Sequence, residues 1–276
     1  MSSRVIIVGC GHMGLAIAYG LLGAEDSGQV IAVERDAERR TLLQGVKGLV
    51  VTDTLTPEPG DLILLAIPPQ DFADFAAAEK HKFDIATPTV SVMAGVTVAH
   101  IARSLGTDEV VRAIPNTPSE VFSGMTVYFA APSVSDTTME RATSLLSSIG
   151  KTLRVRREEL VDDATAICGG GPAFVSYLVD AFCQFAESRG FSDAEGRDMA
   201  TQVFAGSALL ISRSEKPAMQ LCREVMTPGG TTERGIAVFD TAQLKSTITA
   251  ALTASASRSR ELAVLDGVTH PETSEC

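Results

Sequence analysis

Short, unbroken apolar runs recur along the first half of the chain, and segments with helical spacing separate them. Strands are predicted at Arg4–Val8, Val30–Val33, Leu62–Ile67, Thr89–Val92, Val110–Ile114, Met125–Ala130 and Leu153–Val155. Helices are predicted up to Leu22 and over Ala37–Gln44, residues 97–105 and Ser135–Ile149. Strands that are apolar on both faces are typical of a parallel sheet covered by helices on each side. The pattern predicts a doubly wound α/β domain.

The strand pattern stops near Glu158, and only helical patterns follow. One helix is predicted from Pro172 to Gly190, and Ser192 with Glu195 fits a capping box for the next. A shorter helix follows Pro217, and the last runs from Thr241 to Leu265. We therefore predict two domains, residues 1–157 and an all-helical domain of residues 158–276. The apolar stripe from Phe174 to Phe185 is expected to be core or a dimer interface.

Charge and composition exclude several classes of partner. The chain has 23 basic and 34 acidic residues, a net charge of −11, which disfavours nucleic acid and anionic membrane surfaces. No stretch is judged to approach the roughly 18 apolar residues of a membrane span. The five cysteines are scattered, without the spacing of a disulfide framework or a metal site. A cytoplasmic protein with reduced thiols and no metal is expected.

A glycine-rich loop follows the first predicted strand and opens a helix. Gly9, Gly11 and Gly14, with His12 and Met13 between them, match G-x-G-x-x-G. In such a loop the first glycine makes the tight turn, the second admits a pyrophosphate, and the third lets the helix pack closely. The helix start supplies free N–H groups for the phosphates. This context indicates a Rossmann-like dinucleotide site.

The end of the second strand bears on the cofactor. Glu34 lies 20 residues after Gly14, where an acid that binds the ribose hydroxyls of NAD is expected. Arg35 is suited to the extra phosphate of NADP, and Arg39, one helical turn on, is placed to join it. NADP(H) is favoured, and NAD(H) remains an alternative.

Two further loops follow predicted strands at the carboxyl edge of the sheet, where ligands bind in this architecture. They are Ala66-Ile67-Pro68 and Ala94-Gly95, which we include in the expected cofactor site. Taken alone, each is equally well explained as an ordinary loop.

Several segments in order resemble the pyrroline-5-carboxylate reductase family along nearly the whole chain. They are residues 9–14, 64–70, 91–97, 112–118 (Arg-Ala-Ile-Pro-Asn-Thr-Pro), 169–174 (Gly-Gly-Gly-Pro-Ala-Phe) and 225–232 (Val-Met-Thr-Pro-Gly-Gly-Thr-Thr). The Pro-Gly-Gly-Thr-Thr segment is the most specific. The resemblance implies NAD(P)H-dependent reduction of 1-pyrroline-5-carboxylate to L-proline, and a homodimer through the helical domain, often assembled into larger rings.

The resemblance also implies roles for individual residues. Thr232 is expected to be catalytic, with its hydroxyl hydrogen-bonded to the ring nitrogen of the imine. The expected substrate-binding residues are Thr227, Gly229, Gly230, Thr231 and Thr232. Of these, Thr227 and the backbone N–H groups of Gly229, Gly230 and Thr231 are expected to hold the carboxylate. Asn116 is placed with the cofactor site. Without the resemblance, a simple Pro-Gly-Gly turn between two helices is the better reading of this segment.

The chain departs from the family pattern in places. Pro68 stands where the family usually has Lys, and Gly170 where it has Ser; Ile114 and Thr227 replace the usual Met and Ser. The lost lysine removes a cation near the cofactor, and the lost serine removes a donor in the cleft. Two alternatives stay open: a relative that reduces a different cyclic imine, as in secondary metabolism, and a non-catalytic sensor of cofactor redox state.

Overall fold

The computed structural model describes residues 4–24 and 28–265, with side chains described up to residue 261. The described chain forms two compact units. The first comprises the chain up to Gly170 together with the last helix from Ser255 onward, and the second is Gly171–Ala254.

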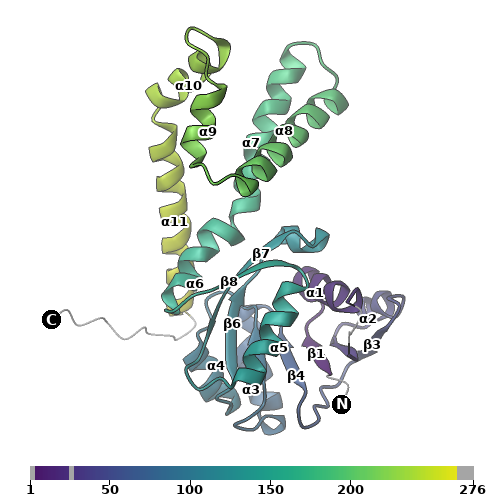
Figure 1. Ribbon diagram of the computed structural model, residues 1–276. Helices are drawn as coiled ribbons and strands as arrows, with labels where there is room; N and C mark the ends of the chain where they lie inside the picture. Colours follow the sequence, from purple (N-terminus) through teal and green to yellow (C-terminus); the bar gives the residue numbers. More distant parts are fainter. Residues whose placement is uncertain (1–3, 25–27, 266–276) are drawn as a thin grey trace, which may run out of the picture. The chain divides into compact units, whose positions relative to one another are not determined.

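The first unit is built on an eight-stranded sheet (Figure 1). Its strands are β1 (Val5–Val8), β2 (Val30–Val33), β3 (Leu49–Thr52), β4 (Leu62–Leu65), β5 (Thr89–Ser91), β6 (Val110–Ile114), β7 (Gly124–Ala130) and β8 (Gly150–Arg154). The order is β3-β2-β1-β4-β5-β6-β7-β8, which confirms a doubly wound topology that reverses between β1 and β4.

One pairing departs from the expected parallel sheet: β7 runs antiparallel to β6. Residues 115–123 join these strands and contain only a short 3-10 turn, Thr117–Val121. A parallel crossover needs about a dozen residues or more, so this link is too short for one. The next link contains a full helix, and β8 is again parallel to β7.

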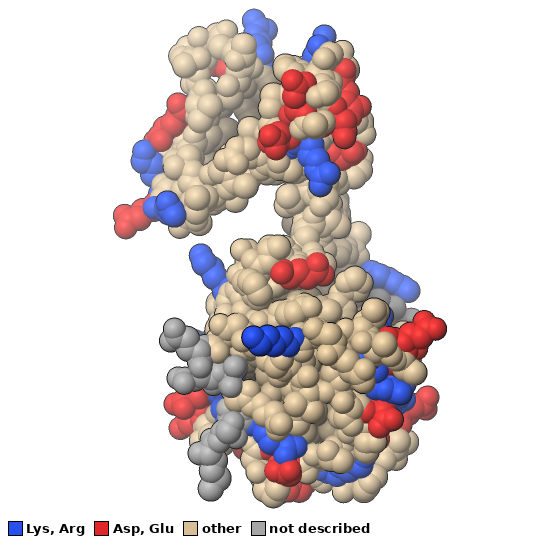
Figure 2. Space-filling view, turned by 90° about the vertical axis from the view of Figure 1, so that its right-hand side faces the viewer, with Lys and Arg blue, Asp and Glu red and all other residues tan. Residues whose placement is uncertain are grey.

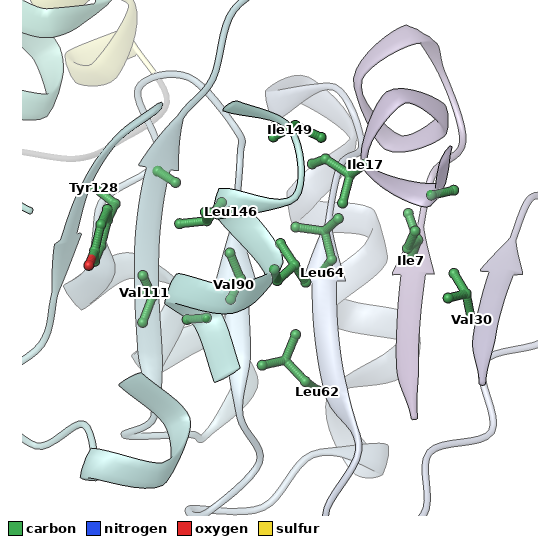
Figure 3. Close-up of a cluster of buried hydrophobic side chains, with 14 of the residues drawn as sticks. Ile7, Ile17, Val30, Leu62, Leu64, Val90, Val111, Tyr128, Leu146 and Ile149 are labelled. Carbon is green, nitrogen blue, oxygen red and sulfur yellow. The ribbon is translucent and has the colours of Figure 1, made fainter. Parts of the chain in front are cut away.

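Helices cover both faces of the sheet (Figure 1). They are α1 (His12–Leu22), α2 (Ala37–Leu43), α3 (Phe72–Glu79), α4 (Val98–Leu105), α5 (Asp136–Ser147) and α6 (Glu159–Ala164). On one face Ile7, Leu64 and Val90 pack against Ile17 of α1 and Leu146 of α5 (Figure 3). On the other, alternate strand residues join a second cluster that includes Phe72, Phe75 and Ile101. Burial of both strand faces explains why the strands are continuously apolar.

The second unit is entirely helical over its described residues. Its helices are α7 (Gly171–Ser188), α8 (Asp193–Arg213), α9 (Ala218–Val225), α10 (Thr231–Thr241) and the first half of α11 (Leu244–Leu265). The α7 and α8 helices pack together, with Phe182 and Phe204 in edge-to-face contact at 5.2 Å. The capping box of Ser192 and Glu195 is present, as the sequence predicts.

The sequence pattern does not locate β3, α3, α6 or α10. The β3 strand is a short edge strand, and its residues are only partly buried. The α3 helix begins shortly after Pro68 and Pro69, which follow the predicted strand Leu62–Ile67. The expected last helix is preceded by a separate one, α10; the two are divided at Gln243, whose φ of 51° cannot continue a right-handed helix.

The compact units do not divide at residue 157. The α6 helix packs on the sheet, because Val161 and Ala164 join a cluster with Ile114 and Val127. Arg260 of α11 forms an ion pair with Asp163, which ties the end of α11 to the same unit. Residues 158–170 and the end of α11 therefore belong to the first compact unit.

The expectation that no segment is apolar and long enough to span a membrane was wrong. The helical stretch Glu159–Ser188 meets that description by length and composition, and little of it is buried in the single chain. Residues of α7 with large exposed apolar side chains include Val175, Tyr177, Phe182 and Phe185. A helix that packs such a face on another protein surface has the same length and composition, so these two properties alone do not indicate a membrane span.

Gly20 of α1 marks a close contact between helices. A Cβ at this position would lie 2.7 Å from the carbonyl oxygen of Ser148, at the end of α5. We predict that Gly20→Ala lowers the free energy of unfolding by about 1–3 kcal/mol, because the helices must separate. Thermal and urea denaturation would measure it. Gly206→Ala, in α8, is the matched control, since its Cβ would meet only a glutamine side chain at 3.8 Å. Equal effects of the two substitutions would contradict this account.

Candidate functional site

A cavity of about 590 Å³ lies at the carboxyl edge of the sheet, where the strand order reverses. The residues that line it come from the ends of β1, β2, β4 and β5, the segment after β3, the starts of α1 and α2, and the region from Pro68 through α3. They are Val8, Gly9, Gly11, Met13, Val33, Glu34, Arg35, Asp36, Arg39, Asp53, Leu55, Ala66, Ile67, Pro68, Pro69, Asp71, Phe75, Glu79, Val92, Met93 and Ala94. This is the position at which doubly wound sheets bind ligands.

The structure brings together most of the expected cofactor residues. Nine of them line the cavity: Gly9, Gly11, Met13, Glu34, Arg35, Ala66, Ile67, Pro68 and Ala94. Gly14 and Gly95 do not line it but shape its wall: Gly14 supports the glycine loop, and Gly95 takes a φ of 78° in the loop after β5.

The glycine loop is shaped by close backbone contacts. Gly9 has a φ of 86°, and a Cβ there would lie 2.8 Å from the carbonyl oxygen of Ala66. A Cβ at Gly14 would overlap the carbonyl oxygen of Gly9. A Cβ at Gly11 would have only the Nη1 atom of Arg39 within 4 Å, at 3.8 Å. The first and third glycines thus pack the loop, and the second leaves its open side free for a ligand.

The start of α1 is open to an anion. The α2, α4, α5 and α8 helices are capped by the side chains of Asp36, Thr97, Ser135 and Ser192, whereas the N-cap of α1 is Gly11, which has no side chain to do so. The first N–H groups of a helix have no partner within the helix. The α3, α6, α9 and α10 helices also start without a side-chain cap, but of the uncapped starts only that of α1 follows the glycine loop that lines the cavity. At α1 these groups and the helix dipole suit the phosphates of a dinucleotide.

The Glu34 carboxylate connects two of the backbone segments that form this site. Its carboxylate accepts hydrogen bonds from the N–H of Cys10, at 3.2 Å, and from the N–H of Asp36, at 3.1 Å. It thereby ties the glycine loop to the loop after β2. Each carboxylate oxygen can accept more than one hydrogen bond, so the group is also able to receive a ribose hydroxyl.

The arginines beside Glu34 have different tasks. Arg40 stabilises the loop after β2, because its Nη1 donates to the carbonyl oxygens of Glu34 and Arg35. Arg35 and Arg39 line the cavity, and within the described part of the chain no hydrogen bond or ion pair is formed by their guanidinium groups. Two uncommitted cations beside an open helix start fit a ligand with several phosphates.

Cys10 is part of this site's packing and not of its chemistry. Burial, and to a smaller extent the negative charge of Glu34, raises the pKa of its thiol to about 12, although the cation of Arg39 acts in the opposite direction. The thiol is therefore protonated and unreactive at neutral pH.

His12 and Asn116 are not brought into the cavity. The imidazole of His12 is 95% exposed and lies 3.6 Å from the carboxylate of Glu120. The side chain of Asn116 donates to the carbonyl oxygen of Cys168 at 3.1 Å and accepts from the N–H of Met125 at 2.9 Å. Asn116 therefore links β7 to the π-helical turn Thr165–Gly169 in this structure.

The expected substrate residues lie together in the second unit, in the loop before α10 and at the first two residues of that helix. Gly229 has a φ of 71° and donates its N–H to the carboxylate of Glu233 at 2.7 Å. The N–H of Gly230 donates to the carbonyl oxygen of Thr227 at 2.8 Å. Gly230 is the N-cap of α10 and provides no side-chain cap, and the Thr232 hydroxyl has no partner among the described residues.

This loop is able to hold a carboxylate, because that of Glu233 already bonds one of its N–H groups. A bound substrate carboxylate would compete with Glu233 for Gly229. The roles assigned to Gly229 and Gly230 thus require rearrangement of the bonds seen here.

Sequence reasoning missed part of the cavity wall. Asp53 and Leu55 follow β3, and Phe75 and Glu79 belong to α3. Both elements were absent from the prediction, so their residues had no assigned place. The run Leu49-Val50-Val51 is the signal that identifies β3.

Charged side chains of both signs lie on the surface. On the face drawn in Figure 2, basic side chains are scattered among acidic ones and form no broad patch. The open helix start and the two arginines of the cavity therefore supply local positive potential in a chain with a net charge of −11.

Two family models match the chain. Residues 158–262 match the family described as pyrroline-5-carboxylate reductase dimerisation, and residues 4–95 match the family described as NADP oxidoreductase, coenzyme F420-dependent. The first match begins at residue 158 and covers the helical region that was expected to form a dimer.

Relatives and solved structures agree along the whole chain. It is 30% identical to the pyrroline-5-carboxylate reductase of Synechocystis over 95% of this chain and 99% of that protein. The Pseudomonas aeruginosa enzyme of the same name is also 30% identical, over 94% and 97%. A pyrroline-5-carboxylate reductase structure from Coxiella burnetii has a TM-score of 0.87 at 27% identity, covering 95% of this chain and 99% of that one.

The glycine loop, the cavity at the switch point of the sheet and the helical second unit thus occur in a chain that aligns from end to end with these enzymes. The resemblance seen in the sequence is confirmed, and the chain belongs to the pyrroline-5-carboxylate reductase family.

Proposed function

We propose that this protein uses NADPH in preference to NADH, and that Thr232 and the loop before α10 bind the substrate. The reaction follows from the family: an oxidoreductase acting on CH–NH groups, which reduces 1-pyrroline-5-carboxylate to L-proline with NAD(P)H. The observation that carries the cofactor proposal is the pair of uncommitted guanidinium groups, Arg35 and Arg39, in the cavity beside the glycine loop.

Different residues of the cavity would bind different parts of the cofactor. Gly11 and the start of α1 would hold the pyrophosphate, Glu34 would hold a ribose hydroxyl, and the two arginines would hold the 2′-phosphate. When bound, the reduced nicotinamide supplies the hydride for the reaction. The match of residues 4–95 to a family described as NADP oxidoreductases supports this choice of cofactor.

Removing either guanidinium group is expected to weaken the binding of NADPH and not that of NADH. We predict that Arg35→Ala and Arg39→Ala each raise the KM for NADPH by about tenfold, because an ionic hydrogen bond contributes about 1.5–3 kcal/mol before the discount for exposure. The KM for NADH should hardly change, since NADH lacks the 2′-phosphate. Lys47→Ala, which removes an exposed cation outside the cavity, is the matched control. Equal losses for both cofactors would contradict the proposed phosphate contact.

Reduction of the imine requires little acid–base catalysis from the protein. A protonated imine is already an electrophile, so positioning supplies much of the rate. In our proposal the Thr232 hydroxyl hydrogen-bonds the ring nitrogen, while Thr227 and the N–H groups of Gly229, Gly230 and Thr231 hold the carboxylate. The uncapped start of α10 supports this, because it favours an anion.

The Thr232 hydroxyl should matter to turnover more than to cofactor affinity. We predict that Thr232→Ala lowers kcat by about ten- to a hundredfold and leaves the Kd for NADPH within about twofold. Thr241→Ala is the control, because that hydroxyl bonds only the carbonyl oxygen of Ala237 in the same helix. Steady-state kinetics with fluorescence titration of NADPH would separate the two quantities. A matched loss of cofactor affinity would show that Thr232 has a structural role.

A panel of cyclic imines, assayed with both NADPH and NADH, tests the substrate. We expect NADPH consumption with 1-pyrroline-5-carboxylate and formation of L-proline, followed by absorbance and by product analysis. Turnover of another imine alone would favour a specialised relative. That alternative has an observation behind it, since Pro68, in place of the usual lysine, forms part of the cavity wall. Tight cofactor binding without turnover of any imine would favour a redox sensor.

The remaining elements of the proposal concern assembly and location. The dimerisation-family match supports self-association of the helical region, and we propose a homodimer that can extend to a ring. The four cysteines among the described residues are unpaired, which suits a reducing cytoplasm.

A further inference from the structure

A buried charged triad lies outside the cavity. Arg112, on β6, is 1% exposed, and its guanidinium group contacts the carboxylates of Glu158 and Asp162. Its Nη1 lies 3.2 Å from Glu158 Oε1 and 3.4 Å from Asp162 Oδ2, and its Nη2 bonds Asp162 Oδ1. Asp162 is also 1% exposed, whereas Glu158 is 18% exposed. Charges buried in this way are costly to desolvate, so stability alone is a weak reason to keep them.

Glu158 connects the triad to the cofactor side of the sheet. The Oε1 atom that contacts Arg112 also accepts the N–H of Val98, at 2.8 Å. Val98 is the first residue of α4, and its helix start is further capped by Thr97. The loop from Met93 to Thr97 runs from the cavity wall to this point. One carboxylate oxygen therefore joins the end of that loop to the buried guanidinium group.

The other contacts of the triad fix its position. Arg112 is built into the middle of β6, which is hydrogen-bonded to a strand on each side. Asp162 belongs to α6, whose Val161 packs against the sheet in a buried cluster. Glu158 is thus held against a rigid base, and the α4 start that it bonds is held with it.

We propose that Glu158, fixed by Arg112, is a positioning residue for the cofactor: it sets the Met93–Thr97 loop in the conformation that forms the cavity wall. This rests on the proposed use of that cavity by the nucleotide. Glu158 touches no cofactor atom in this proposal and acts through the N–H of Val98.

Three variants test the proposal. Glu158→Ala removes the acceptor and leaves Asp162 to pair with Arg112, and we expect the Kd and KM for NADPH to rise about three- to tenfold with kcat within about twofold. Glu158→Gln keeps an oxygen that can accept the Val98 N–H, and it should restore the affinity to within about twofold. Glu159→Ala, the matched control, removes an adjacent exposed acid and should bind like the unaltered protein.

A further variant reaches the same bond from the other side. Val98→Pro removes the N–H donor and leaves all three charged groups in place. Proline is tolerated at the first position of a helix, and the φ of −77° and ψ of 155° at Thr97 suit a residue before proline. It should weaken NADPH binding as much as Glu158→Ala does. Circular dichroism would establish that each variant is folded.

The outcomes separate this inference from the proposed function. Unchanged NADPH affinity in Glu158→Ala, or failure of Glu158→Gln to restore it, would overturn the positioning role while leaving the activity of the unaltered protein as proposed. Absence of NADPH binding by the unaltered protein, measured by fluorescence titration, would overturn both.

Discussion

The close packing of α1 on β1 is the contact on which the nucleotide site depends. Gly14 allows it, because any side chain there would meet the carbonyl oxygen of Gly9. Gly9 in turn lies against the backbone of Ala66, so the ends of β1 and β4 and the start of α1 are fixed to one another. The N–H groups at the start of α1 are thereby aimed at the cavity, where the structure provides no side-chain cap. A protein with a net charge of −11 can hold an anion at such a place because the attraction is local and comes from backbone dipoles and two arginines.

Around this contact the fold uses charged groups in two different ways. Glu34, Arg40 and the triad of Arg112, Glu158 and Asp162 hold backbone segments in place. The guanidinium groups of Arg35 and Arg39 form no hydrogen bond or ion pair with the described residues, and both side chains line the cavity. Arg35 and Arg39 are therefore suited to bind phosphate because their guanidinium groups are available, and not only because of where they stand in the sequence.

Much of the fold could be predicted because its core is apolar in a regular way. The β2 and β6 strands begin and end where the apolar runs do, since both of their faces are buried. The prediction failed where that rule does not apply. The β3 strand lies at the edge of the sheet and is only partly buried, and α3 begins shortly after Pro68 and Pro69, a residue type that usually interrupts regular structure. The β7 strand was predicted, but its antiparallel orientation was not, because orientation depends on the length of the link and leaves no mark on the strand's own pattern.

The sequence by itself determined the family, the doubly wound fold and the glycine loop, because these rest on local patterns: strand burial, glycine spacing and short motifs. Only the tertiary structure decided which charged residues are available to a ligand. Arg35 and Arg40 are both basic residues near the end of β2. The guanidinium group of Arg40 bonds two carbonyl oxygens, whereas that of Arg35 bonds neither and lines the cavity. Asn116 belongs to a family motif, and its amide is taken up by Met125 and Cys168. The meeting of Arg112 with Glu158 and Asp162 joins residues about fifty positions apart, and only the packing of α6 on the sheet brings them together.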